Sequence, residues 1–234
     1  MLELLFLLCS FSGASTGPVS MGMGGAGIAA VDPMESGILN PALLGHLNDY
    51  SMGAFYGVDP QTSENNSEAW GVVVSDGSPR NIFSASLSYQ RRTIQALDKV
   101  EWQGQRIHLG LGEVFAPGWS IGIGGTILQD KSDSLGKYNQ HNLQSGIIWT
   151  PRDWLGVGFV WDNLLHTESS VPDELALRPS VGLGANFLFQ RFFRFRLDLK
   201  RQLEENSRGY IDLMAGTESI ILDYFALRLG GSWL

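Results

Sequence analysis

The sequence predicts an all-β fold, an antiparallel transmembrane β-barrel that follows a compact N-terminal segment. Three observations lead to this prediction. Apolar and polar residues alternate in single steps along about eleven segments. Aromatic residues lie near the ends of those segments, as in membrane barrels. No apolar run of about 18 or more residues follows the N-terminus, which argues against a transmembrane helix.

Alternation is clearest in RFFRFRLDLK, residues 191–200. Its apolar positions are Phe193, Phe195, Leu197 and Leu199, and its charged positions are Arg194, Arg196, Asp198 and Lys200. Only an extended strand separates two such sets, because its side chains point to opposite faces in turn. The charges would face water in a soluble sheet and line the lumen in a membrane barrel, so this strand alone leaves both arrangements open.

Residues 1–17 are predicted to be a secretory signal peptide. Leu2 to Phe11 form an apolar stretch, and Ser12, Gly13 and Ala14 offer the small residues of a cleavage site, although Glu3 stands where a basic residue is usual. Cys9, the one cysteine of the chain, lies inside this segment. The mature chain would then hold no disulfide and no thiolate metal site.

Residues 18–48 read as turns and irregular backbone, because glycines are followed by Asp-Pro and Asn-Pro pairs. A phosphate-binding loop is excluded, since no strand precedes the glycines and no Lys-Ser or Lys-Thr follows them. The stretch GMGGAGIAAVDPMESGILNPALLG instead resembles the N-terminal motif of the FadL superfamily, especially its PorV/PorQ branch, although Leu43-Leu44 stand where Gly-Leu is common. The matching residues are Gly22, Gly24, Gly25, Gly27, Asp32, Asn40, Pro41 and Ala42.

This resemblance implies an outer-membrane barrel of about fourteen strands in a Gram-negative bacterium. It also implies that residues 18–48 fold inward as a hatch and that residues 49–234 form the barrel. Near the other end, residues 226–231 resemble a strand that such proteins place before their last strands.

The expected strands follow in order after residue 49. They are residues 50–57, 68–76, 82–91, 101–111, 118–128, 140–149, 154–162, 179–189, 192–200, 209–217 and 223–233. Most are close to the ~9–11 residues that a tilted strand needs to cross a bilayer. Strands of soluble domains are mostly shorter, about 5–6 residues.

Tryptophans fall near the ends of these strands and not in their middles. They are Trp70, Trp102, Trp119, Trp149, Trp154, Trp161 and Trp233. A soluble core would place tryptophan centrally, whereas an amphipathic ring prefers the headgroup level of a bilayer. We therefore expect a girdle of aromatic side chains that face lipid.

Connections alternate between long and short. The long, polar ones are residues 58–67, 92–100, 129–139, 163–178 and 201–208, and the short ones are residues 77–81, 112–117, 150–153, 190–191 and 218–222. Outer-membrane barrels have this asymmetry, with short periplasmic turns and long external loops. Acidic residues in the long loops, Asp130 among them, are expected to be solvated.

Strand parity leads to an expectation about the C-terminus. If the first strand rises from the periplasm, the eleventh ends outside, and an odd count leaves an unpaired edge in lipid. We therefore expect about three further strands beyond residue 234, as the fourteen of the family would require. The alternative is that residues 50–57 belong to the hatch and ten strands close a small barrel.

Several glycines fall on the predicted lumen face. They are Gly110, Gly122, Gly124, Gly156, Gly158, Gly182, Gly184, Gly216 and Gly230. Their missing side chains would either make room for something inside the barrel or relieve crowding where strands bend. The sequence leaves both explanations open.

Three classes of function remain. The resemblance favours a PorV-type barrel that is accessory to protein secretion or surface attachment, and the alternative is passive transport of small hydrophobic solutes. The partners would be outer-membrane lipid, and either a protein of a secretion system or such a solute. The net charge of −8 argues against nucleic acid.

An outer-membrane enzyme is the third class, and we do not expect it. His108 shares the lumen face with Ser84, Ser86, Ser88, Asp162 and Asp198, but no spacing motif links them. No cofactor and no metal site are expected. Arg194, Arg196, Asp198 and Lys200 are predicted to form a ladder of paired charges with neighbouring strands, with a selectivity filter for anionic solutes as the alternative.

Overall fold

The structure is a computed structural model that describes residues 17–60, 65–96, 99–167, 170–172, 175–190, 192–203, 211–221 and 225–233. The predicted signal peptide, apart from Gly17, lies outside these residues. Within the described ranges, no helix has the length and apolar character needed to span a bilayer.

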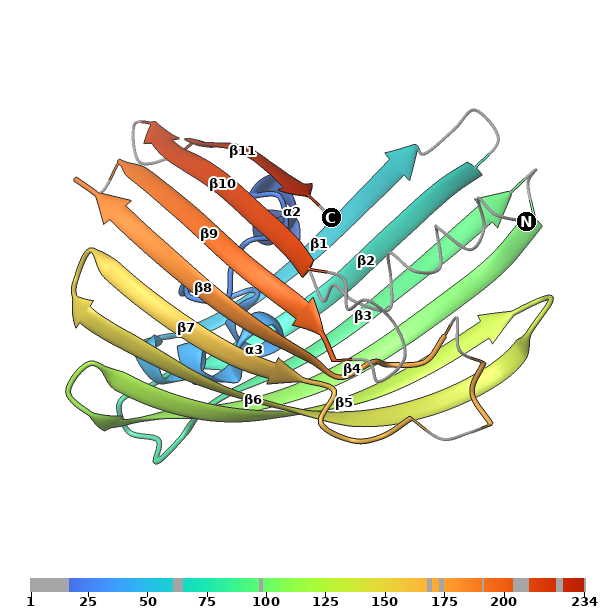
Figure 1. Ribbon diagram of the computed structural model, residues 1–234, viewed down its shortest axis with the longest axis horizontal. Helices are drawn as coiled ribbons and strands as arrows, with labels where there is room; N and C mark the ends of the chain where they lie inside the picture. The colour runs from blue at the N-terminus through green and yellow to red at the C-terminus, as the bar shows by residue number, and fades with distance from the viewer. Residues whose placement is uncertain are drawn as a thin grey trace.

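All eleven strands form one antiparallel sheet, and their order in the sheet is their order in the chain (Figure 1). They are β1 (Tyr50–Pro60), β2 (Asn65–Asp76), β3 (Ser84–Ala96), β4 (Lys99–Ala116), β5 (Trp119–Ser132), β6 (Gly136–Arg152), β7 (Leu155–Asp162), β8 (Ser180–Phe189), β9 (Phe193–Gln202), β10 (Ile211–Ile221) and β11 (Phe225–Trp233). The predicted all-β fold of antiparallel strands is confirmed.

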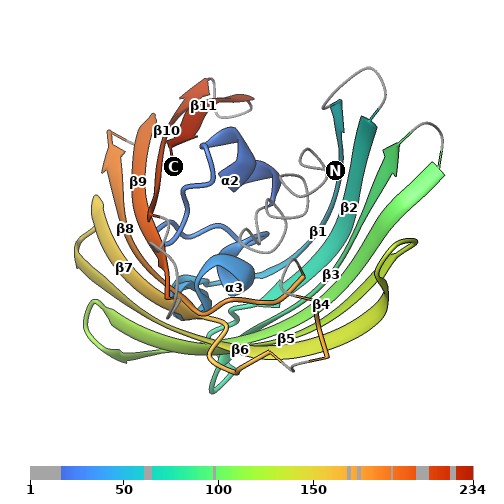
Figure 2. The same ribbon diagram turned by 45° about the vertical axis from the view of Figure 1, so that its right-hand side comes forward.

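The sheet curls around the N-terminal segment, as Figure 2 shows, and its two edges are β1 and β11. These edges do not pair with each other in the described part of the chain. The alternative that residues 50–57 belong to the hatch is wrong, because β1 pairs with β2 from Tyr50–Asp76 to Pro60–Asn66. Further strands beyond residue 234 stay a prediction.

Apolar side chains lie on the outer face of this wall, and small or polar ones lie on its inner face. In β5, exposed Ile121 and Ile123 alternate with buried Ser120 and Gly122. In β9, exposed Leu197 alternates with Arg196 and Asp198, which are 0% and 1% exposed. This pattern is the reverse of a soluble sheet, in which the apolar face packs on a core.

The strands continue further than the sequence predicted. β4 has 18 residues and β6 has 17, so most of the predicted loops 92–100 and 129–139 are strand. The prediction failed because it ended each strand where the apolar alternation stops. Polar residues continue to pair across the strands beyond that point, as in the exposed hydrogen bond from Gln129 Nε2 to Asn139 Oδ1 (2.9 Å). Asp130, predicted to be solvated in a loop, lies in β5 and is 2% exposed.

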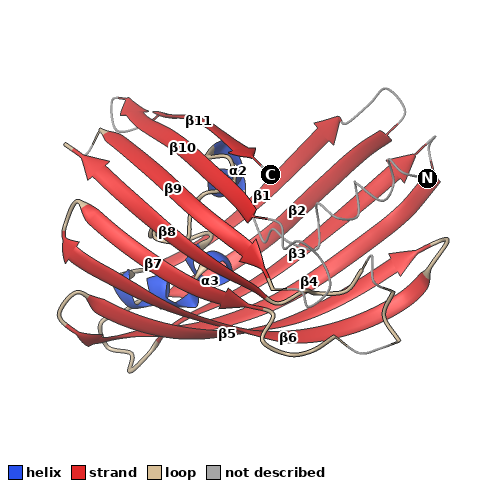
Figure 3. Cartoon of the chain, viewed as in Figure 1, coloured by secondary structure: helices blue, strands red, loops and turns tan. Residues whose placement is uncertain are grey.

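Three short helices form the hatch inside the curve of the sheet, where Figures 2 and 3 show the chain's only described helices. They are α2 (Pro18–Gly22), α3 (Ser36–Leu39) and the 3₁₀ helix η1 (Pro41–His46). Asn40 precedes η1, and its side chain accepts a hydrogen bond from the Ala42 N–H, which caps the helix. Ala42 and Leu43 pack on Ile148 of β6, so part of the apolar core lies between hatch and wall.

Candidate functional site

The hatch motif lies inside the barrel wall. Gly27, Asn40, Pro41 and Ala42 are buried, whereas Gly22, Gly24, Gly25 and Asp32 are partly exposed. The two halves of the segment rest on different parts of the wall. Residues 22–29 contact β7–β11, and residues 33–46 contact β1–β6, with Asn40 also reaching β7.

Wall glycines allow the hatch backbone to approach the sheet. A Cβ built at Gly158 would lie 2.7 Å from the carbonyl oxygen of Ile28, and one at Gly156 would lie 2.9 Å from that of Ala29. The predicted lumen glycines that meet hatch atoms are Gly110, Gly122, Gly156, Gly158, Gly182, Gly184, Gly216 and Gly230, and of these Gly182 meets only the side chain of Ile28. Gly124 differs, because it faces the side chain of His108 on the wall itself. Room for an inner segment therefore explains most of this set.

Asp198 of β9 anchors the N-terminal half of the hatch. Its Oδ2 accepts hydrogen bonds from the backbone N–H groups of Gly27 (2.6 Å) and Ile28 (2.9 Å). Neighbouring Arg196 donates from Nη1 to the Ala26 carbonyl oxygen at 3.4 Å. Asp198 therefore makes two short hydrogen bonds to the hatch, whereas Arg196 makes one long one, so Asp198 is the stronger holding point of the two.

The other two predicted ladder residues pair across strands. Arg194 contacts Glu218 of β10 at 3.1 Å, and Arg228 of β11 contacts the same carboxylate at 2.6 Å. Lys200 contacts Asp162 of β7 at 2.6 Å. The predicted ladder is therefore divided, since Arg194 and Lys200 meet charges on other strands while Arg196 and Asp198 turn to the hatch.

Side chains of β4 and β6 hold the C-terminal half of the hatch. His108 Nε2 lies 2.7 Å from the Gly37 carbonyl oxygen, and its Nδ1 lies 2.8 Å from Thr126 Oγ1. Gln144 Nε2 donates to the Ile38 carbonyl oxygen at 3.0 Å. One ring nitrogen of His108 thus contacts the hatch, and the other contacts the neighbouring wall strand β5.

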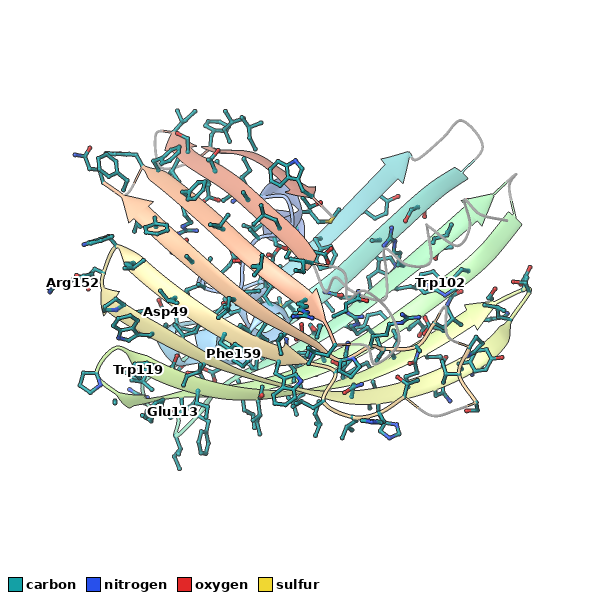
Figure 4. The ribbon with its side chains drawn as sticks, viewed as in Figure 1. Asp49, Trp102, Glu113, Trp119, Arg152 and Phe159 are labelled. Atoms are coloured by element: carbon teal, nitrogen blue, oxygen red, sulfur yellow. The ribbon has the colours of Figure 1, made fainter. Side chains whose placement is uncertain are left out.

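Asn40 joins the two halves of the hatch to the wall. Its Nδ2 donates to the carbonyl oxygens of Ile28 (3.0 Å) and Phe159 (3.3 Å), the latter on β7 and labelled in Figure 4. Its Oδ1 accepts from the Ala42 N–H at 3.1 Å. Pro41, which follows, begins η1 without needing a backbone donor. These contacts give the Asn-Pro-Ala motif a structural role.

Glu35 is a central hatch residue that the sequence did not single out. It is 1% exposed, and its carboxylate accepts from the N–H groups of Val19 (2.6 Å) and Ser20 (2.9 Å). Burial, and then the charge of Asp32, raises the pKa of this carboxyl. An isolated acidic residue carries no spacing signal, and the motif pointed to Asp32, whose Oδ1 accepts from the Met34 N–H in a local turn.

The described residues between β7 and β8, which are 163–167, 170–172 and 175–179, include a part that packs on the inner face of the wall. Gln140 of β6 donates from Nε2 to the Leu175 carbonyl oxygen (2.9 Å) and accepts at Oε1 from the Leu177 N–H (3.1 Å). Val171 and Leu175 pack on Ile94 and Trp102 of the wall. The sequence predicted only an external loop here.

Trp102 corrects the predicted aromatic girdle. It is 3% exposed and lies on the inner face under residues 163–179, whereas the other six tryptophans are between 38% and 57% exposed, Trp119 being the least (Figure 4). A position near a strand end does not determine which face of the sheet a side chain occupies. Trp102 can point inward because Val171 and Leu175 form an apolar cluster with it.

A small cavity of about 30 Å³ remains between hatch and loop. Arg106, His108, Gln144, Asp162 and Lys200 line it from the wall, with Ile38 on the hatch side and Leu177 on the loop side. About 10–15 Å³ is needed for each water, so the cavity holds roughly two waters and no aromatic ring. The described residues include no group of three or more His, Cys, Asp or Glu that could hold a metal ion.

No family model and no curated protein matches the chain. Among solved structures, the CymD monoaromatic hydrocarbon channel is similar to it, with a TM-score of 0.50 and 15% sequence identity over 87% of this chain and 88% of that one. Identity this low shows the fold alone. The likeness supports the FadL-like barrel fold that the N-terminal motif predicted, and it gives no support to the PorV/PorQ branch.

Proposed function

We propose that this protein is a FadL-type channel of the outer membrane of a Gram-negative bacterium and that it passes small hydrophobic solutes. One observation carries the proposal: a separate N-terminal hatch fills the lumen of a wall whose fold resembles a hydrocarbon channel. Exposed apolar side chains such as Ile123 (61%) and Leu109 (51%) support placement in lipid, because water would disfavour so wide an apolar belt.

The contacts of the hatch suggest which part of it moves. Residues 22–29 meet β7–β11 mainly through glycines and the hydrogen bonds to Asp198. Residues 33–46 add links from Ser75, His108, Ser120 and Gln144, and they lead directly into β1. Release of the N-terminal half breaks fewer links, so we propose that this half opens the path.

A second candidate is the PorV-type role, in which the barrel binds a protein of a secretion or surface-attachment system and passes nothing. The observation that favours it is the filling of the lumen, because the hatch packs on Ile148 of β6, and Val171 and Leu175 pack on Ile94 and Trp102. The two functions differ in whether the hatch must move.

A disulfide across the moving half tests the channel. A Cβ built at Gly22 would lie 3.1 Å from the Cβ of Arg228, close to the ~3.5–4.5 Å of disulfides, so Gly22→Cys with Arg228→Cys needs a small shift only. Uptake of radiolabelled toluene would be measured in cells whose other outer-membrane channels are deleted. We expect uptake with the reduced variant and background uptake with the oxidised one.

The reduced form of the same variant is the matched control, since it differs only in the cross-link. Equal uptake by oxidised and reduced forms would exclude the N-terminal half as the gate. If the wild-type chain takes up no more toluene than cells without it, the accessory role becomes the better explanation.

A further inference from the structure

Two lysines lie directly opposite each other on the outer face of the sheet, beyond its apolar belt. Lys131 of β5 pairs in register with Lys137 of β6, and both are exposed. Directly opposed residues have Cβ atoms about 4.5–5.5 Å apart, and like charges in such a pair repel each other. No ion pair of either lysine occurs among the described residues.

Their height on the sheet matches a headgroup region. Going outward along β5 and β6, the outer face carries Ile127 opposite His141, then Gln129 opposite Asn139, and then Lys131 opposite Lys137. Residues two apart on a strand are about 6.6 Å apart, so the lysines follow the last isoleucine by roughly 13 Å along the strand. This is the zone where an outer leaflet presents polar headgroups.

Arg91 of β3 extends the basic surface. It follows Tyr89 on the outer face, and Tyr89 packs on Trp70 with ring centroids 5.2 Å apart. Arg91 pairs with Gln105 of β4, and Gln105 pairs with Gln129 of β5. Two strand spacings, about 9–10 Å, therefore separate Arg91 from Gln129, which lies opposite Asn139. The whole chain carries a net charge of −8, so three basic side chains on one surface are not expected from its average composition.

We propose that Lys131, Lys137 and Arg91 bind the phosphates of a phosphorylated glycolipid in the outer leaflet, with lipid A as the occupant. A phosphate between Lys131 and Lys137 turns their mutual repulsion into two attractive contacts. Arg91 supplies a second phosphate contact from the rung next to the lysines, and the adjacent amides of Gln129 and Asn139 donate to sugar or phosphate oxygens. This inference depends on the outer-membrane location in the proposed function and not on transport.

Binding of fluorescent lipid A to the full chain in detergent micelles tests it. Each lysine near an anionic lipid surface is expected to contribute about fivefold in affinity, so Lys131→Gln with Lys137→Gln should weaken binding more than tenfold. Arg152→Gln is the matched control, because Arg152 is an exposed cation at the other end of β6 (Figure 4) and should leave binding unchanged. All three positions are exposed, and heat-modifiable gel mobility would verify that each variant folds.

Lipid A without its phosphates is the second arm. It should bind wild-type chain at least tenfold more weakly than lipid A with both phosphates, and the double lysine variant should not distinguish the two lipids. Equal binding by wild type and double variant, or equal binding of both lipids, would overturn the site. If lipid A binding depends on its phosphates but cells with the chain take up no toluene, the lipid A site is supported and the channel function is excluded. If the cells take up toluene but binding does not depend on the phosphates, the channel function is supported and the lipid A site is excluded.

Discussion

Neighbouring residues of β9 face different surroundings, and one pair of substitutions separates them. Leu197 is 39% exposed on the outer face, while Asp198 is 1% exposed and bound to the hatch. Leu197→Arg should impair assembly, since an arginine on the lipid face near the midplane costs about 2–4 kcal/mol. Asp198→Asn should assemble, with a hatch that is held less firmly. The folded fraction after refolding into micelles measures both, and equal tolerance would contradict the assignment of faces.

Glu35 predicts a pH dependence at the same scale. Burial raises its pKa above 4.5, so the folded chain binds this proton more tightly than the unfolded chain does. The contribution of Glu35 to the free energy of unfolding therefore falls as pH rises from 4.5 through the raised pKa. Urea titrations at several pH values would measure the free energy of unfolding of wild type and of Glu35→Gln. Over that pH range the free energy of unfolding of wild type should fall relative to that of Glu35→Gln.

His46 serves as an internal check on that experiment. Burial lowers its pKa below 6.5, so its contribution to stability falls as pH drops through 6.5, the opposite direction. His46→Gln should therefore change the pH profile with the opposite sign from Glu35→Gln. A constant difference between wild type and Glu35→Gln from pH 4 to pH 7 would show that Glu35 does not have a raised pKa.

At the scale of elements, two segments enter the lumen and are expected to act as barriers in series. One is the hatch, and the other is the segment between β7 and β8, whose Val171 and Leu175 pack on the wall. Deleting residues 20–38 should raise conductance in a planar bilayer, and replacing residues 166–176 with a short Gly-Ser link as well should raise it further, because current must pass both barriers. Unchanged conductance in the folded double variant would exclude them as barriers.

The whole molecule is a curled sheet whose edge strands each have one neighbour. Among the residues that the structure describes, β1 pairs with β2 alone and β11 with β10 alone, whereas β5 is paired on both sides. Amides without a strand partner exchange faster with water, so hydrogen exchange of the full chain in micelles should be faster in β1 and β11 than in β5. Equally slow exchange in all three strands would mean that the edges have found a partner.

The local pattern of residues was enough to predict the strands, their antiparallel order and the outward apolar face, because each depends on period-two alternation. The inward position of the hatch was predicted only from the resemblance of the motif that includes Asn40-Pro41-Ala42 to the FadL superfamily. The ends of β4 and β6 were missed because polar pairs such as Gln129 and Asn139 continue a strand without an apolar signal.

Only the tertiary structure decided which wall residues hold the hatch and which face Trp102 occupies. Asp198 lies 171 residues from Gly27 in the chain, and no periodicity connects a lumen carboxylate to a particular backbone N–H group. Likewise, the inward positions of Val171 and Leu175 depend on Gln140, Ile94 and Trp102, which belong to three different strands. Contacts of this kind come from the curvature of the sheet, because that curvature brings distant strands and the hatch into one small volume.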